Sequence, residues 1–272
     1  MAINNILILG YGKMGQWFAN QLRSNYNVAV TERGKVSPNG DSGLSFIDIP
    51  QKIKEFAPDL VINAVNLSAT KSAFNQVMEY LPQSTILADI TSIKGNMKEY
   101  YQKSGFRWVS THPMFGPTFA NMQNLQKEYA IIIEESDEEG GHFFNNFYRS
   151  FGMTIHTLPF RRHDELMAES LSLPFLATLL FSSNSHYNAM PGTTCKKHRE
   201  IASGLLSEDN HLLSEVLFNE HTMEQIEGMA DTLKLYAEII RNKDSDTLFS
   251  MLDKLRNRLN SPIAERMGFG TS

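Results

Sequence analysis

Hydrophobic and polar positions follow two different patterns along this chain, and the change falls near residue 160. Before that point, short continuous apolar runs are separated by segments whose apolar residues recur at helical spacing. Continuous apolar runs of this kind are typical of strands buried on both faces of a parallel sheet. The runs that we interpret as strands are 5–10, 28–31, 59–65, 85–90, 106–109, 129–133 and 153–158.

The segments between these runs predict helices. Met14, Trp17, Phe18 and Leu22 recur at helical intervals after the first run, and another helix is expected after Ser68, a potential N-cap. Strands that alternate with helices indicate an α/β fold in which a doubly wound, mostly parallel sheet is covered on both faces.

The second half of the chain predicts helices only. From His163 onward we find no strand pattern, and the long apolar segment 165–187 contains Pro174, where a kink is expected. Its most apolar part, 171–181, is shorter than the roughly 18 to 20 residues that span a bilayer, so we interpret it as a buried helix. Two further helical stripes follow, the second after Asp244, a potential cap. We therefore expect an all-helical C-terminal domain.

Composition narrows the classes of protein. Hydrophobic residues make up 42% and charged residues 20% of the chain, as in ordinary soluble globular proteins. The net charge of −5, with mixed signs, provides no basic patch, so we do not expect nucleic acid as a partner. The single cysteine, Cys195, fits a reducing compartment, and no signal peptide precedes the first strand. These features predict a cytoplasmic protein without a membrane partner.

A glycine-rich turn joins the first expected strand to the first expected helix. Gly10 permits the tight bend, Gly12 lets the backbone approach a pyrophosphate, and Gly15 lets the helix pack closely on the sheet. Phosphates can then bind free amides at the positive end of the helix dipole. This context predicts a Rossmann-type dinucleotide-binding domain over residues 1–160, followed by a helical domain over 161–272. The residues expected in the turn are Gly10, Tyr11, Gly12, Lys13, Met14 and Gly15.

The second strand suggests which dinucleotide binds. Glu32 follows this strand directly, where a carboxylate accepts the ribose hydroxyls of NAD and repels the 2′-phosphate of NADP. Arg33 beside it can instead face that phosphate, so NADP is the less favoured alternative, and a solvated Glu–Arg pair is a third interpretation. Later strand ends add Ala64, Val65 and Asp89 as candidates for the cofactor site.

His112 is the strongest candidate for chemistry. It follows the expected strand 106–109, in a turn with two prolines and a glycine, and Pro113 favours an extended conformation of His112. In doubly wound domains, ligands bind at the carboxyl ends of the strands. The alternative is a capped strand end with an incidental histidine.

Three motifs together resemble the prephenate dehydrogenase family, which includes the arogenate dehydrogenases. They are the glycine turn, the segment Asp89-Ile-Thr-Ser92-Ile-Lys94, and the segment His112-Pro-Met-Phe-Gly-Pro117. The resemblance covers most of residues 1–160 and continues more loosely into the helical half. It implies NAD-dependent oxidative decarboxylation of prephenate to 4-hydroxyphenylpyruvate, in tyrosine biosynthesis, by a homodimer. Alternatives are an arogenate dehydrogenase using NAD or NADP, a β-hydroxyacid dehydrogenase or imine reductase, and a non-catalytic NAD-binding sensor.

The resemblance also implies roles for two residues. His112 would accept the substrate's hydroxyl proton as the hydride leaves, and a neutral histidine suits this task because its reference pKa is about 6.5. Ser92 would hydrogen-bond the same hydroxyl or the histidine. Ser92 is alternatively a helix cap before Lys94.

The helical half departs from the family pattern. The segment Ser172-Leu-Pro-Phe175 lacks both histidines of the family's His-Leu-Pro-His, and Gly204 lies at or near the position of the family's carboxylate-binding arginine. A dianionic substrate needs cationic partners, so we expect Arg199, aided by Lys196, to replace that arginine. A solvated helix face is the alternative for both. Histidine spacing indicates no metal site, and His163-Asp164 is expected to open a helix.

Overall fold

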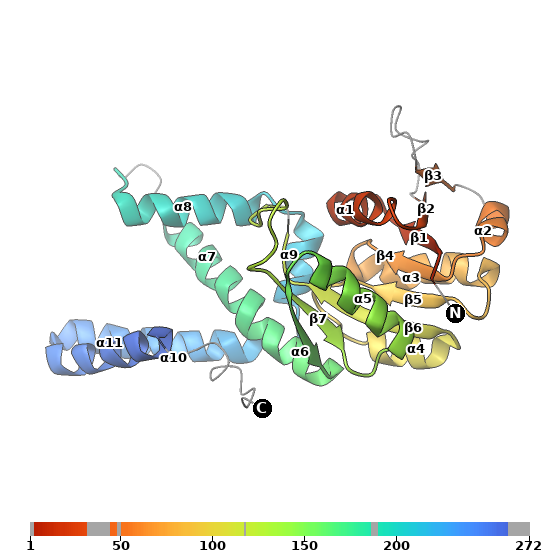
Figure 1. Cartoon of the computed structure of the whole chain (residues 1–272). Coiled ribbons are helices and arrows are strands. Elements are labelled where there is room, and N and C mark those ends of the chain that lie inside the picture. The colour runs from red at the N-terminus through yellow and green to blue at the C-terminus, as the bar shows by residue number, and fades with distance from the viewer. Residues whose placement is uncertain (1–2, 32–43, 48–49, 117, 186–189, 261–272) are drawn as a thin grey trace. The chain divides into compact units, whose positions relative to one another are not determined.

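The computed structural model describes residues 3–31, 44–47, 50–116, 118–185 and 190–260 (Figure 1). Contacts between residues divide the chain into two compact units, Met1–Thr222 and Met223–Ser272. The sequence-based division after residue 160 stays a prediction, since it concerns functional domains rather than these units.

The first unit is built around one eight-stranded sheet with the strand order β3-β2-β1-β4-β5-β6-β7-β8. All neighbouring strands are parallel except β6 and β7, which are antiparallel. The predicted α/β fold with a mostly parallel sheet is therefore confirmed. The strands are β1 (Asn5–Leu9), β2 (Asn27–Thr31), β3 (Ser45–Phe46), β4 (Leu60–Asn63), β5 (Ile86–Asp89), β6 (Arg107–Pro113), β7 (Tyr129–Ile133) and β8 (Thr154–Leu158).

Helices connect these strands and fill the rest of the unit. The first five α-helices alternate with strands, as the apolar spacing predicts, and no strand follows β8 in the part of the chain that the structure describes. The helices are α1 (Lys13–Leu22), α2 (Pro50–Phe56), α3 (Leu67–Val77), the 3-10 turn η1 (Met78–Tyr80), α4 (Met97–Ser104), α5 (Glu138–Ser150), α6 (Phe160–Met167), the π-helical turn η2 (Ala168–Ser172), α7 (Leu173–Asn184), α8 (Thr193–Leu206) and α9 (Asn210–Leu217).

Burial explains why the central strands read as continuous apolar runs. Every residue of β4 and β5 is buried, because both faces of the sheet are covered. An aromatic cluster then fixes the loop after β6. The ring centroid of Trp17 on α1 lies 5.2 Å from that of Phe115 and 5.5 Å from that of Phe147 on α5. These contacts hold the segment next to His112 against two helices.

Strand β6 is longer than the expected strand 106–109. Thr111, His112 and Pro113 pair with Ile132, Ile131 and Ala130 of the antiparallel strand β7. His112 thus lies within the strand rather than in a turn after it. Pro113 is the last residue of β6, and the backbone N of Met114 after it still donates to the carbonyl oxygen of Tyr129 at 2.9 Å. The short edge strand β3 was not expected from the sequence.

Two expectations about helices are wrong. Ser68 does not cap α3 but lies inside its first turn, and Asn66 is the N-cap. Helix α7 buries none of its residues, although its apolar sequence predicts a buried helix. Periodicity cannot reveal this, because α7 is apolar on all sides and nothing in its pattern says which neighbours it has.

The continuous helical segment Phe160–Asn184 combines α6, η2 and α7. It is long and apolar enough to cross a membrane by length and composition alone, which is weak evidence because core helices of soluble proteins pass the same criterion. The π-helical turn η2 immediately precedes α7, whose first turn contains Pro174, where the sequence predicts a kink. π-turns of this kind are frequent at functional sites.

The second unit consists of two helices, α10 (Thr222–Asn242) and α11 (Ser245–Asn260). Lys243 adopts a left-handed conformation, with φ of 52°, in the turn that joins them. Asp244 caps α11 as predicted, since its carboxylate accepts hydrogen bonds from the backbone N and the hydroxyl of Thr247. Several large apolar side chains of the unit stay exposed, among them Met223, Leu233, Ile240, Phe249 and Leu259.

Candidate active site

A cavity of about 850 Å³ lies at the carboxyl ends of β4, β5 and β6. This is the edge of the sheet where doubly wound domains bind their ligands. One side is lined by residues 12–14, 64–67, 90–92 and 112–116, and the other by residues of η2, α7 and α9 and of the turn before α9. All of these residues belong to the first unit.

The glycine turn has the geometry of a pyrophosphate cradle. Gly10 has φ of +89°, a conformation that only glycine adopts without strain. A Cβ on Gly15 would lie 2.1 Å from the carbonyl oxygen of Gly10, so α1 can start here only with glycine. A Cβ on Gly12 would meet nothing within 4 Å, so space is open above its backbone. These three glycines have the conformational roles that the sequence predicts, and the turn fits a dinucleotide.

The other residues expected at the cofactor site differ in their placement. Lys13, Met14, Ala64 and Val65 line the cavity together with Gly12. Tyr11 is buried and packs edge-on against Phe46, with ring centroids 5.2 Å apart. Glu32 and Arg33 lie outside the described residues, so the preference for NAD over NADP stays a prediction.

Asp89 is also expected at the cofactor site, but it does not line the cavity. It is fully buried beneath it and forms an ion pair with Lys94, whose Nζ lies 2.7 Å from Asp89 Oδ1. The carboxylate also accepts hydrogen bonds from the backbone N and hydroxyl of Thr91 and from the hydroxyl of Tyr101. Burial opposes ionisation of Asp89, but Lys94 and these hydrogen bonds hold its pKa below the usual value. We therefore treat the pair as ionised, although burial also lowers the pKa of Lys94 against the opposing effect of Asp89.

Both residues expected to act on substrate, His112 and Ser92, line the cavity. His112 is 4% exposed and reaches the cavity from the end of β6. Ser92 lies in the loop after β5 and does not cap α4, whose N-cap is Asn96. The structure thus brings the two side chains to the same cavity, while their roles stay predictions.

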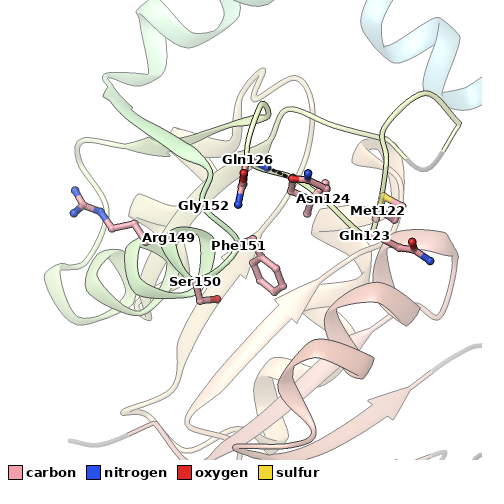
Figure 2. A pocket seen from close by; sticks show the side chains of 9 residues that line it. Met122, Gln123, Asn124, Gln126, Arg149, Ser150, Phe151 and Gly152 are labelled. Atoms are coloured by element: carbon pink, nitrogen blue, oxygen red, sulfur yellow. Dashed lines mark hydrogen bonds between the residues drawn. The ribbon is translucent and has the colours of Figure 1, made fainter.

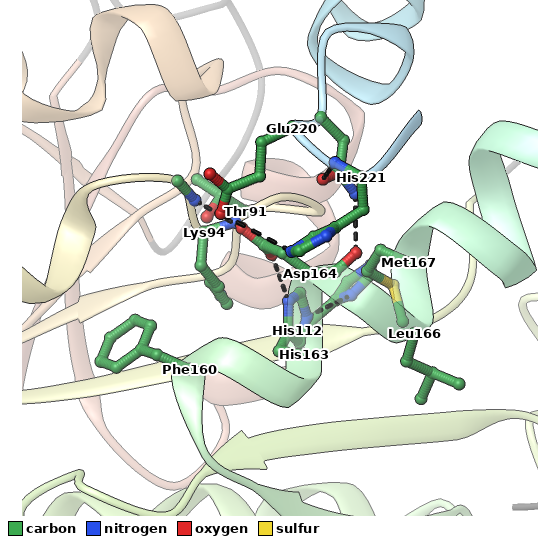
Figure 3. A network of polar contacts seen from close by, with 12 residues as sticks. Thr91, Lys94, His112, Phe160, His163, Asp164, Leu166, Met167, Glu220 and His221 are labelled. Atoms are coloured by element: carbon green, nitrogen blue, oxygen red, sulfur yellow. Dashed lines mark hydrogen bonds and ion pairs between the residues drawn. The ribbon is translucent and has the colours of Figure 1, made fainter. Parts of the chain in front are cut away.

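Figure 3 shows a polar network behind His112. His112 Nδ1 lies 3.1 Å from Nε2 of His163 on α6, and His163 Nδ1 lies 2.7 Å from Asp164 Oδ1. The Asp164 carboxylate also accepts hydrogen bonds from the backbone N of Lys94 at 2.9 Å and of Gly95 at 2.7 Å. His112 Nε2 forms no hydrogen bond within the part of the chain that the structure describes, so it is the ring nitrogen left for a ligand.

Burial keeps both histidines of this network neutral. It lowers the pKa of His112 well below 6.5, and His163 and Lys94 lower it further because added positive charge would be repelled. Burial also lowers the pKa of His163, with Asp164 opposing the shift. The pKa of Asp164 lies below its usual value because the hydrogen bonds from His163 and two backbone amides outweigh the effect of burial. His112 can therefore accept a proton at neutral pH.

The opposite side of the cavity is acidic. Its carboxylates come from Glu208, Asp209 and Glu215, and Glu128, just before β7, adds a fourth carboxylate to the cavity lining. Lys13 is the one cation among the described lining residues. Three of these carboxylates serve the protein's own structure. Glu208 accepts a hydrogen bond from the hydroxyl of Thr118, and Asp209 caps α9 through the backbone N of His211. Glu215 accepts hydrogen bonds from the backbone N of Leu67 and Ser68 at the start of α3.

The cations expected to bind substrate carboxylates do not line this cavity. Lys196 is exposed and Arg199 is half-buried, both on α8. At the family's arginine position, a Cβ on Gly204 would lie 2.6 Å from two ring atoms of Phe119, which itself lines the cavity. The Phe119 ring therefore occupies the space that a side chain at position 204 would enter.

A second, more open cavity of about 610 Å³ lies between the segments 122–126 and 149–152 (Figure 2). Arg149 is the one charged side chain among its described lining residues, and neither histidine nor carboxylate joins it there. This cavity thus has no acid–base pair, unlike the cavity at His112. Nowhere in the described residues do three or more His, Cys, Asp or Glu side chains form a group that could hold a metal.

The His163–Asp164 pair is the part of the site that the sequence did not reveal. We expected these residues to open a helix, but they lie in the second turn of α6, which begins at Phe160. His163 lies 51 residues from His112 in the chain, and no local pattern indicates their contact. The one available signal is the presence of adjacent ionisable residues on the face of α6 that is buried.

Fold and site together define a Rossmann-type nucleotide-binding protein with a neutral histidine at its ligand cavity. The family model "Prephenate dehydrogenase, nucleotide-binding domain" matches residues 26–149, which include Ser92 and His112. This part of the chain thus matches the nucleotide-binding domain of the prephenate dehydrogenase family.

Individual proteins are also similar to this chain. A probable arogenate/prephenate dehydrogenase from Methanocaldococcus jannaschii is 25% identical over 94% of this chain and 60% of its own length. A 4-amino-4-deoxyprephenate dehydrogenase from Streptomyces pristinaespiralis is 24% identical over 65% of this chain and 61% of its own length. The chain thus spans about three fifths of these relatives. The crystal structure of prephenate dehydrogenase from A. aeolicus, in complex with hydroxyphenyl propionate and NAD+, shares the fold at a TM-score of 0.78 and 17% identity, covering 95% of this chain and 98% of that one.

Proposed function

We propose that this protein catalyses the NAD-dependent oxidative decarboxylation of prephenate to 4-hydroxyphenylpyruvate. One observation carries the proposal. A neutral histidine, with Nε2 available, shares a cavity with a glycine turn that fits a dinucleotide. The reaction needs both parts side by side, because a proton and a hydride leave neighbouring atoms of the same substrate.

Different residues bind the cofactor and act on the substrate. The turn at Gly10–Gly15 and the N-terminus of α1 hold the pyrophosphate, and Ala64 and Val65 line the adjoining space. When bound, NAD supplies the hydride acceptor. His112 Nε2 accepts the proton of the substrate's ring hydroxyl as that carbon loses its hydride and becomes a carbonyl. The bond to the ring carboxylate then breaks, carbon dioxide leaves, and the electron pair of that bond makes the ring aromatic. Ser92 donates a hydrogen bond to the same substrate oxygen.

The acidic lining favours a second candidate, an arogenate dehydrogenase. Arogenate carries an ammonium group where prephenate carries a keto group, and carboxylates such as Glu208 and Glu215 attract a cation rather than a second carboxylate. The relative from M. jannaschii is named a probable arogenate/prephenate dehydrogenase, a name that covers both substrates. We retain Arg199 and Lys196 as proposed partners of the substrate carboxylates, which requires α8 to move toward the cavity.

We propose NAD as the cofactor because Glu32 follows β2 directly in the sequence, where a carboxylate is expected to accept the ribose hydroxyls, with NADP as the alternative that Arg33 would serve. We also propose that the protein is cytoplasmic and that helical residues after 160 form the dimer interface of a homodimer. Exposed apolar side chains on α7, α10 and α11, such as Leu180, Leu233 and Phe249, support this assembly.

The proposal is tested by measuring reduction of NAD and of NADP by purified protein with prephenate and with arogenate. We expect turnover with prephenate and NAD, and a product that absorbs as a phenol. Turnover with arogenate alone would favour the second candidate. Reduction with neither substrate, in a protein that still binds NAD, would identify a non-catalytic sensor and overturn the proposal.

A further inference from the structure

His163 and Asp164 form a buried acid–base pair that no step of the proposed reaction uses directly. His163 is fully buried and Asp164 is 5% exposed, both on α6. Ionisable groups are costly to bury unless they are paired and hydrogen-bonded. Apart from the contact between the two residues, the side-chain hydrogen bonds of the pair lead to His112 or to the loop after β5 (Figure 3).

The position of each proton follows from the hydrogen bonds. The backbone N–H groups of Lys94 and Gly95 can only donate, so the two oxygens of Asp164 accept from them. Asp164 Oδ1 also faces His163 Nδ1 at 2.7 Å, and a carboxylate there requires the proton on Nδ1. Because His163 is neutral, its Nε2 then carries a lone pair and accepts the hydrogen bond.

The same logic fixes His112. Its Nδ1 lies 3.1 Å from the acceptor Nε2 of His163, so Nδ1 of His112 carries the proton. The remaining nitrogen of His112, Nε2, is then unprotonated and lies toward the cavity. The opposite tautomer would place two lone pairs against each other between the two rings.

We propose that Asp164 and His163 are positioning residues that hold His112 in the tautomer whose Nε2 accepts a proton. The inference rests on the proposed function only in assigning His112 as the base. Asp164 is held in place, since its carboxylate accepts from the backbone N of Lys94 and Gly95 and Asn219 Nδ2 donates to its carbonyl oxygen at 2.7 Å. Other ionisable groups near His112 are Lys94 and Asp89, which neutralise each other in the ion pair under β6.

The first test reads the tautomer without any turnover. In the free full-length protein labelled with ¹⁵N-histidine, NMR should show His112 protonated on Nδ1 and unprotonated on Nε2 at pH 7. Assignment uses the signal lost in His112→Asn. In Asp164→Asn the NH2 group replaces either Oδ1, where it faces the Lys94 N–H, or Oδ2, where it faces the Gly95 N–H. At Oδ1 it donates to His163 Nδ1 and reverses both tautomers, so His112 becomes protonated on Nε2; at Oδ2 it leaves the tautomers unchanged. The ¹⁵N spectrum of the variant distinguishes the two placements. A wild-type His112 that already carries its proton on Nε2 would overturn the proposal.

The second test measures kinetics. Asp164→Asn should lower kcat about 10²-fold or more, with KM and NAD affinity changed only a few-fold, because the base is blocked rather than the binding site. His163→Gln should retain more activity than His163→Leu, because only the glutamine oxygen can accept from His112 Nδ1. His156→Gln is the control, a half-buried histidine that stacks on Tyr129 instead.

These outcomes separate the inference from the proposed function. If the wild type turns over no substrate but shows the expected tautomer, the proposed function fails and the positioning role stands. If prephenate is turned over and a folded Asp164→Asn variant with His112 protonated on Nε2 retains kcat within a few-fold, the positioning role is wrong. Should that variant not fold, the wild-type tautomer together with the contrast between His163→Gln and His163→Leu decides.

Discussion

The two sides of the cavity are built in opposite ways. On the network side, formed by Asp89, Lys94, His112, His163 and Asp164, charged and polar groups are buried and hydrogen-bonded to one another. On the acidic side, formed by Glu208, Asp209 and Glu215, the carboxylates are exposed or half-buried, and all three bind the protein's own backbone or hydroxyl groups. The difference separates two properties of the site. The buried hydrogen bonds of the network side determine the orientation of His112, whereas the described acidic side offers no arginine for a dianionic substrate.

The largest effect is expected where the network side meets the substrate. His112→Asn should lower kcat by about 10²- to 10⁴-fold and leave NAD affinity nearly unchanged, because general base catalysis contributes this much and the glycine turn is untouched. Stopped-flow or steady-state cofactor reduction measures the first quantity, and a fluorescence titration with NAD the second. A variant within a few-fold of wild type would remove His112 from the mechanism.

The pH profile sharpens this prediction. The pKa of His112 lies well below 6.5, so the base is already neutral between pH 6.5 and 8 and its protonation should not limit activity there. As the pH falls through that lowered pKa, His112 gains a proton and kcat/KM should fall. His112→Asn should lose this acid limb. A wild-type limb centred at 6.5 would contradict the effect of burial.

The next effect concerns the ion pair that supports the network side. Lys94→Met should lower the free energy of unfolding by about 3–5 kcal/mol at pH 7, because Asp89 then stays buried without its counter-charge. Urea unfolding followed by circular dichroism measures this loss. The loss should shrink at acid pH, where the unpaired Asp89 of the variant, its pKa now raised by burial, takes up a proton.

An exposed pair of the same type provides the control. Lys98 Nζ lies 3.0 Å from Glu135, with side chains 42% and 31% exposed, so Lys98→Met should cost less than about 1 kcal/mol. Equal losses in the two variants would mean that burial of the Asp89–Lys94 pair contributes nothing special to stability.

The sequence predicts the network side only as far as local patterns reach. Strands such as β4 and β5 are found because both faces are buried, and the glycine turn because the positive φ at Gly10 and the close approach at Gly15 each demand glycine. His112 is found from its neighbours in sequence. Its partner His163 is not, because the contact joins β6 to α6 and depends on how these elements pack.

The acidic side was predicted less well for the same reason. The resemblance implies an arginine at or near Gly204, so its absence can be noticed in the sequence. The ring of Phe119 that occupies the space next to Gly204 comes from a loop distant in the chain, which no local pattern reveals. The exposure of α7 likewise depends on which elements cover it, and an apolar sequence alone does not contain that information.

A gain of function tests whether the acidic side limits substrate choice. In Phe119→Ala/Gly204→Arg, the ring next to residue 204 is removed and a cation is added beside the cavity. KM for prephenate should fall about 10-fold, which corresponds to a charged hydrogen bond of roughly 1.5 kcal/mol, while KM for arogenate changes less. Phe119→Ala alone is the matched control. If the double variant binds prephenate no better than this control, position 204 does not face the bound substrate.

The smallest effect decides whether a carboxylate of the acidic side acts as a cap or as a substrate ligand. Glu215 accepts hydrogen bonds from the backbone N of Leu67 at 3.1 Å and of Ser68 at 2.9 Å, where the positive end of the α3 dipole favours a negative charge. Glu215→Ala should therefore lower the free energy of unfolding by about 1 kcal/mol, and Glu215→Gln by less, because the amide oxygen still accepts one bond.

If capping is its whole role, neither variant changes the ratio of KM for arogenate to KM for prephenate. If Glu215 instead binds the ammonium group of arogenate, Glu215→Gln should raise KM for arogenate about 10-fold, the loss of one charged hydrogen bond, with KM for prephenate unchanged. Unfolding and kinetics measured on the same preparations distinguish the two roles.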